Sequence, residues 1–181
     1  PGCPHRLCLA WYARWLRFEA TIAITDSAMA DQGNASTRYG SAALDQLTER
    51  LSGTPDPRKR YEYVLWLAKK LPTMPAELQT EERKVKGCVS QVFIASDLID
   101  GRLRWQGDSD ALITKGLLAL LIKGLTDLTP AEVMAVDPGV IAATGLQASL
   151  TPSRANGFLN ILRTMQAQAE ALTTGSGSTA A

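Results

Sequence analysis

The sequence Val89-Ser90-Gln91-Val92-Phe93-Ile94-Ala95 is followed, across Asp100-Gly101, by Arg102-Leu103-Arg104-Trp105-Gln106. The first segment is mostly apolar and the second alternates apolar and polar residues, so both are predicted to be β-strands. Aspartate and glycine tolerate the positive φ angles that a tight hairpin turn requires. This part of the chain is therefore predicted to fold as an antiparallel hairpin, and the rest of the domain is built outward from it.

Two helices are predicted before the hairpin. The first has three leucines at helical spacing, Leu44, Leu47 and Leu51. It is expected to end near Gly53. The second begins at Asp56, a favourable N-cap, with Pro57 in its first turn, and ends before Pro72. The residues predicted on its inward face are Tyr61, Leu65, Ala68 and Leu71.

Three further helices are predicted after the hairpin. A long apolar helix follows Gly107-Asp108-Ser109 and runs to about Leu125. Thr129-Pro130-Ala131-Glu132 is a capping box with proline in the first turn, so another helix starts there. The last helix begins near Thr151-Pro152. The order helix, helix, hairpin, helices predicts an α+β domain in which helices pack on a small antiparallel sheet.

Residues 41–173 are predicted to form this domain, and residues 174–181 a flexible tail. Residues 1–40 are treated as a disordered or mis-called N-terminal extension, since the first eighteen residues contain three arginines and no acid. Three interpretations stay open: translation from a misplaced start, a remnant of a targeting peptide, or a genuine extension. The first is favoured, with Met29 as the biological start.

Composition excludes several classes of protein. Residues 41–172 contain 15 Lys+Arg and 15 Asp+Glu, so the basic excess of a nucleic-acid binder is absent. The sequence has no uninterrupted run of about 18 apolar residues, so a membrane span is not supported. The three cysteines, Cys3, Cys8 and Cys88, do not indicate a disulfide framework. A reducing compartment is expected, either the cytoplasm or, if the N-terminus is a transit remnant, the plastid stroma.

Cys88 is the candidate functional residue because other chemistries are eliminated. The single histidine, His5, lies outside the predicted domain, which excludes a Cys-His pair there and leaves too few ligands for a metal site in one chain. Cys88 follows Gly87, so it is expected on a tight, mobile loop. Three upstream cations, Arg83, Lys84 and Lys86, are expected to favour the nucleophilic thiolate. The alternative, an inert buried cysteine, stays open on these residues alone.

Three ordered blocks resemble the SufE family, the sulfur acceptors of cysteine desulfurases. The first is Gly87-Cys88-Val89-Ser90-Gln91-Val92-Phe93-Ile94. The second is Trp105-Gln106-Gly107-Asp108-Ser109-Asp110-Ala111 with Lys115-Gly116, and the third is Leu150-Thr151-Pro152-Ser153-Arg154. With the stretch from Tyr61 to Pro72, the resemblance covers about Leu44 to Leu172. It departs from the family in the first 40 residues, and at Val89 and Phe93, where Gln and Trp are common.

The resemblance implies a fold shared with the IscU-type iron-sulfur scaffolds, without their metal ligands. It implies that Cys88 accepts persulfide sulfur from a SufS-like cysteine desulfurase, stimulates that enzyme, and passes sulfur to a SufB-like scaffold complex. The protein is then a sulfurtransferase-like carrier with no cofactor of its own, and the pyridoxal phosphate belongs to the desulfurase. Two other functions stay open, an iron-sulfur scaffold and an adaptor that uses Cys88 only for packing.

Supporting residues each have a structural and a functional interpretation. Asp108, Ser109 and Asp110 cap the following helix, or they lie beside the Cys88 loop with Asp110 holding it closed. Ser90 and Gln91 are half-exposed strand residues, or they donate hydrogen bonds to a persulfide. Arg154 opposes the dipole of the last helix, which favours a partner contact. Lys115 is a solvated helix charge or a second partner contact.

Overall fold

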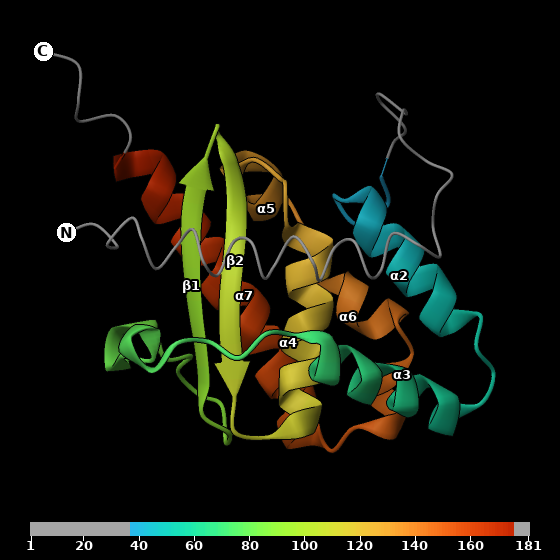
Figure 1. The fold of residues 1–181 in the computed structure, drawn as a ribbon. Coiled ribbons are helices and arrows are strands. Elements are labelled where there is room, and N and C mark those ends of the chain that lie inside the picture. Colours follow the sequence, from blue (N-terminus) through green and yellow to red (C-terminus); the bar gives the residue numbers. More distant parts are fainter. Residues whose placement is uncertain (1–36, 176–181) are drawn as a thin grey trace, which may run out of the picture.

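The computed structural model describes residues 37–175, so the predictions for Met29 and for most of the N-terminal extension and tail lie outside it. Within this range the chain forms two strands, six α-helices and three short 3-10 helices (Figure 1). They are, in chain order, α2 (Ala42–Ser52), α3 (Pro57–Lys70), η1 (Ala76–Leu78), η2 (Glu81–Arg83), β1 (Val92–Ile99), β2 (Arg102–Ser109), α4 (Leu112–Leu125), α5 (Pro130–Met134), α6 (Gly139–Ala143), η3 (Leu146–Ser149) and α7 (Pro152–Gly175). The α+β prediction is confirmed.

The hairpin forms as predicted, with β1 and β2 antiparallel and Ile99 opposite Arg102. Asp100 and Gly101 make the turn with φ angles of 51° and 73°, the region that these residue types tolerate. The start of the first strand was predicted wrongly. It begins at Val92, and Val89 lies outside it with 89% of its surface exposed.

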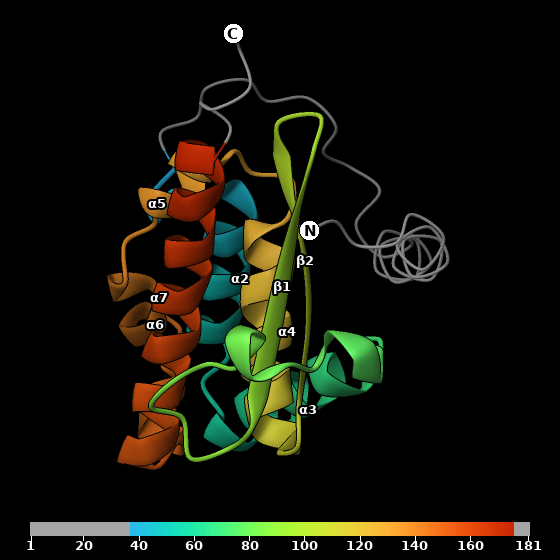
Figure 2. The ribbon, with the colours of Figure 1, turned by 90° about the vertical axis from the view of Figure 1, so that its left-hand side faces the viewer.

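One face of the hairpin is covered by helices. Figure 2 shows the sheet nearly edge-on, with α2, α4 and α7 on the same side of it. Helix α4 is buried along most of its length, and Trp105 of β2 donates a hydrogen bond from Nε1 to the carbonyl of Leu125 at its end. Helices α3 and α4 are in close contact, because a Cβ at Gly116 would lie 2.2 Å from the carbonyl oxygen of Val64. A single core therefore joins the sheet to the helices.

The helix starts that the sequence predicted are confirmed. Asp56 accepts a hydrogen bond from the backbone of Arg58, and Thr129 and Glu132 form the reciprocal capping box. The inward face of α3 was predicted correctly in part. Ala68 and Leu71 are buried as expected, but Tyr61 and Leu65 are only half-buried, and Val64 and Leu67 are the fully buried residues. The short elements α6 and η3 were not predicted, and α7 continues to Gly175, two residues into the predicted tail.

Candidate functional site

Cys88 lies in a loop of residues 86–91, here called the Cys88 loop, which is closed at its base. Lys84 and Phe93 form an antiparallel bridge, and the N–H of Val85 donates to the carbonyl of Val92 at 2.8 Å. Gly87 has a φ of +75°, a conformation that glycine adopts without strain. The loop is therefore a short excursion between two paired segments, with the cysteine near its tip.

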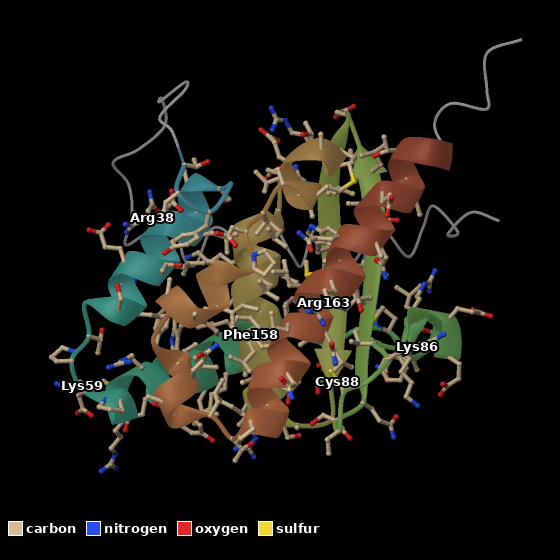
Figure 3. All side chains as sticks on the ribbon, turned by 180° about the vertical axis from the view of Figure 1, so that it is seen from behind. Arg38, Lys59, Lys86, Cys88, Phe158 and Arg163 are labelled. Carbon is tan, nitrogen blue, oxygen red and sulfur yellow. The ribbon has the colours of Figure 1, made fainter. Side chains whose placement is uncertain are left out.

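The loop rests on the N-terminal half of α7. The Cys88 Sγ lies 3.6 Å from the carbonyl oxygen of Gly157, and Asn160 Nδ2 donates to the carbonyl of Gly87 at 3.0 Å. A Cβ on Gly157 would lie 3.5 Å from the sulfur, so the helix is approached closely at this point. Figure 3 shows Cys88 against α7. The thiol is thus half-buried rather than presented to solvent.

A second set of contacts joins the other side of the loop to the end of β2 and the start of α4. The N–H of Gln91 donates to Asp110 Oδ1 at 2.9 Å, and the N–H of Asp110 donates to the carbonyl of Gln91 at 3.2 Å. The hydroxyls of Ser90 and Thr114 are 3.3 Å apart. Asp110 therefore bonds directly to the backbone of the Cys88 loop, as expected of a residue that holds the loop closed.

The expectation that upstream cations favour the Cys88 thiolate is wrong for this conformation. Burial raises the pKa of the Cys88 thiol above its ordinary value. The cations are directed elsewhere: Lys84 Nζ pairs with Glu81 at 2.9 Å, Arg83 donates to the carbonyl of Leu78, and Lys86 is exposed. A thiol held in this position is mostly protonated near neutral pH, which protects it from adventitious reaction.

Alkylation of Cys88 by iodoacetamide is therefore expected to be slow in the folded chain. The experiment uses a Cys3→Ser/Cys8→Ser background. The pH midpoint of the alkylation rate is expected to be higher in the folded chain than in the same chain unfolded in urea. The reason is that burial disfavours the charged thiolate in the folded state alone. A midpoint of the rate–pH curve at or below that of the unfolded chain would contradict the burial of the thiol.

Asp108 and Lys115 form an internal ion pair. Lys115 Nζ lies 2.7 Å from Asp108 Oδ1, and the two side chains are only 14% and 12% exposed. Asp108 Oδ2 also accepts from the N–H of Met74 at 3.0 Å. Lys115 is therefore not the solvated helix charge that was one of its two interpretations, since its ammonium group is paired within the domain. Because Met74 belongs to the loop before η1, the pair anchors that loop to the hairpin and α4.

The remaining predicted residues are placed differently from one another. Ser109 ends β2 and accepts from the N–H of Ala111, the N-cap of α4, whereas Asp108 makes no capping bond to that helix. Ser90 and Gln91 precede β1, so they are loop residues and not half-exposed strand positions. Arg154 is exposed in the first turn of α7 and remains available for a partner contact.

Three residues of the site were not predicted from the sequence: Thr114, Gly157 and Asn160. Gly157 had a detectable signal, because a glycine inside a helix often marks a close approach of another segment. Among residues 37–175 no group of three histidine, cysteine or acidic side chains is placed to hold a metal ion. Within the same range, no helix combines the length and apolarity needed to cross a bilayer.

Comparison with known proteins places the chain in a family. Residues 45–169 match the SufE family model, described as an Fe-S metabolism associated domain. The chain is 54% identical to an uncharacterized SufE-like protein of Synechocystis over 132 residues, 73% of this chain and 83% of that protein. It is 39% identical to the cysteine desulfuration protein SufE of Plasmodium vivax, over 62% of this chain and 46% of that one.

Two further comparisons concern organelle relatives and structure. The chain is 38% identical to the Arabidopsis thaliana SufE-like protein 1, chloroplastic/mitochondrial, over 70% of this chain, but it spans only 34% of that relative's length. The solution structure of a hypothetical protein from Thermus thermophilus superposes with a TM-score of 0.65 at 29% identity, covering 74% of this chain and 98% of the other. The family model covers most of the chain, so this protein belongs to the SufE family of cysteine desulfuration and iron-sulfur metabolism proteins.

Proposed function

We propose that this protein accepts persulfide sulfur from a cysteine desulfurase on Cys88 and carries it to iron-sulfur cluster assembly. The observation that carries the proposal is the setting of Cys88, which is half-buried in a short loop fastened by a few hydrogen bonds to α7 and to Asp110. Such a thiol is protected in the free protein and becomes exposed when the loop moves. The similarity to proteins named for cysteine desulfuration supports the same reading.

The transfer is a thiol–persulfide exchange. The Cys88 thiol loses its proton, and the resulting thiolate attacks the terminal sulfur of the desulfurase persulfide. A sulfur–sulfur bond forms on Cys88 while the donor's sulfur–sulfur bond breaks, and the donor leaves as a thiolate. No external oxidant or reductant is needed, since one such bond replaces another. The same exchange in the next step delivers the sulfur to a thiol of a SufB-like scaffold complex.

Docking on the desulfurase is proposed to release the Cys88 loop. The raised pKa of the thiol has burial as its cause, so a loop that leaves α7 loses the source of the shift. The tethers to be broken are a few hydrogen bonds, among them those from Asn160 to the Gly87 carbonyl and from the Gln91 N–H to Asp110. Stimulation of the desulfurase then follows from removal of sulfur from its own cysteine. Exposed Arg154 lies in the first turn of α7, the helix on which the loop rests, and is proposed as a partner contact.

Replacing Asp110 by alanine is expected to raise the rate of Cys88 alkylation several-fold in the free protein. The substitution removes the acceptor of the Gln91 N–H, one of the bonds that hold the loop closed. Asp137→Ala is the matched control, because Asp137 accepts a comparable backbone bond from Gly139 elsewhere in the fold. Equal alkylation rates in the Asp110→Ala variant and the unsubstituted chain would remove the tethering role.

The function is tested by intact-protein mass spectrometry after incubation with an active cysteine desulfurase and cysteine. The expected result is a gain of one or more sulfur masses that is lost on reduction. No gain, with cysteine still consumed by the desulfurase, would leave Cys88 as a packing residue and the protein as an adaptor. The compartment proposed for this reaction is the cytoplasm or, as the name of the Arabidopsis relative suggests, an organelle.

A further inference from the structure

A polar cavity of about 170 Å³ lies against the β1–β2 hairpin, next to α7 and η2. Figure 2 shows α7 and the green segment that carries η1 and η2 both lying next to β1. The polar residues lining the cavity come from four elements: Arg83 from η2, Ser96 and Asp97 from β1, Gln106 from β2 and Gln168 from α7. Leu78 and Ala95 supply apolar surface. The cavity is distinct from the Cys88 site, since Gln168 lies three turns of α7, about 16 Å, beyond Gly157.

Two buried acceptors in the lining of this cavity have no hydrogen-bond donor among residues 37–175. The Oε1 atoms of Gln106 and Gln168 expose almost no surface and receive no bond. Their amide orientations are fixed by the opposite ends, since Gln106 Nε2 donates to Asp97 at 3.5 Å and Gln168 Nε2 donates to the carbonyl of Ile94 at 3.1 Å. Rotating either amide by half a turn would place its oxygen against another acceptor oxygen, that of Asp97 or of the Ile94 carbonyl. Buried acceptors of this kind normally have a partner, which marks this part of the cavity as a candidate site for a ligand with hydrogen-bond donors.

The charged residues of the cavity define what that molecule must carry. Arg83 offers a guanidinium group whose one hydrogen bond within residues 37–175 is a long one, 3.5 Å to the carbonyl of Leu78. Asp97 lies with the two glutamine oxygens on the acceptor side. An anion alone would be repelled by the carboxylate and the two amide oxygens, and a cation alone would be repelled by the guanidinium group. A zwitterion satisfies both sides at once.

We propose that this cavity binds a free α-amino acid with a small side chain. Its ammonium group donates to Gln106, Gln168 and Asp97, its carboxylate accepts from Arg83, and its side chain contacts Leu78 and Ala95. At about 30 Å³ per water molecule the cavity has room for five or six waters, which is sufficient for alanine or cysteine. Small side-chain movements, common at binding sites, are needed to open the two glutamine oxygens to the ligand.

The site is tested by titrating the ¹⁵N-labelled Cys88→Ser chain with L-alanine and following its amide spectrum. Cys88→Ser removes the sulfur chemistry, so the result does not depend on the proposed function. The expected result is a saturable shift, at about millimolar concentration as befits so small a ligand, confined to β1 near Asp97 and to the side-chain amides of Gln106 and Gln168. Acetate and ethylamine, which each carry only one of the two charges, are expected to give no saturable shift.

Variants establish which side chains bind. Arg83→Gln is expected to weaken L-alanine binding by about tenfold or more, because it removes a charge-assisted bond. Lys84→Gln is the matched control, since that neighbouring cation pairs with Glu81 outside the cavity lining. Arg83→Lys keeps the charge and is expected to retain part of the affinity. The absence of a saturable shift, an equal response to acetate, or unchanged binding by a folded Arg83→Gln chain would overturn the proposal and leave the cavity to water.

Discussion

Cys88→Ser is expected to abolish sulfur uptake from the desulfurase entirely. A serine hydroxyl does not ionise near neutral pH and cannot form a sulfur–sulfur bond, so the exchange has no acceptor. The fold is expected to survive, because the hydroxyl takes the place of a half-buried thiol, and the bond from that thiol to the carbonyl of Gly157 is a weak one. Transfer is measured with ³⁵S-labelled cysteine and non-reducing gels, and the melting temperature is measured alongside.

The matched control is the Cys3→Ser/Cys8→Ser chain, which is expected to take up sulfur at the rate of the unsubstituted protein. Desulfurase turnover is recorded in the same reactions and is expected to fall in Cys88→Ser to its level without this protein. Full stimulation by Cys88→Ser without sulfur uptake would instead show that docking alone activates the enzyme. Sulfur uptake by Cys88→Ser at the original rate would show that Cys88 is not the acceptor.

Asp108→Ala is expected to lower the free energy of unfolding by about 3–5 kcal/mol, since it leaves a largely buried ammonium group without its counter-ion. It also removes the acceptor for the N–H of Met74. Native domains are stable by only about 5–15 kcal/mol, so this one change takes a large part of the total. Urea unfolding monitored by circular dichroism gives the loss as a shift of the midpoint.

Two further variants separate loss of the ion pair from a failure to fold. Asp108→Ala/Lys115→Met is expected to recover part of the loss, because it removes the stranded charge. Asp108→Asn retains an acceptor for Met74 and is measured if the alanine variant does not fold. A loss below about 1 kcal/mol for Asp108→Ala would mean that the pair contributes no more than a surface ion pair.

Local patterns predicted the hairpin and the helix starts correctly because their causes are local. The turn needs two residues that accept positive φ, and Asp100-Gly101 supplies them. The capping box of α5 is fixed by Thr129 and Glu132 within one turn. The start of β1 was misplaced because Val89 was counted with the apolar residues of the strand, although strand pairing begins only at Val92.

The parts of the candidate site that carry a recognisable motif were predicted from the sequence. The parts that are brought together only by the fold were missed. Cys88 and the neighbourhood of Asp110 were identified from their motifs, whereas Asn160 lies 73 positions from the Gly87 carbonyl that it binds. The basic run upstream of Cys88 was misread because charge alone does not show direction, and Lys84 turns to Glu81. A solvated charge was one of two interpretations of Lys115, because the helical pattern does not show that Asp108, on β2, lies within reach of its ammonium group.

Locating the transferred sulfur shows directly whether Cys88 is the acceptor, because the chain has three cysteines. After reaction with the desulfurase and cysteine, the protein is alkylated and digested with trypsin, and the peptides are sequenced by tandem mass spectrometry. Trypsin separates Cys88, on residues 87–102, from Cys3 and Cys8 on residues 1–6 and 7–14. We expect an alkylated persulfide, one sulfur mass heavier than the alkylated thiol, on the Cys88 peptide. Extra sulfur found on the Cys3 or Cys8 peptide, with none on Cys88, would contradict it.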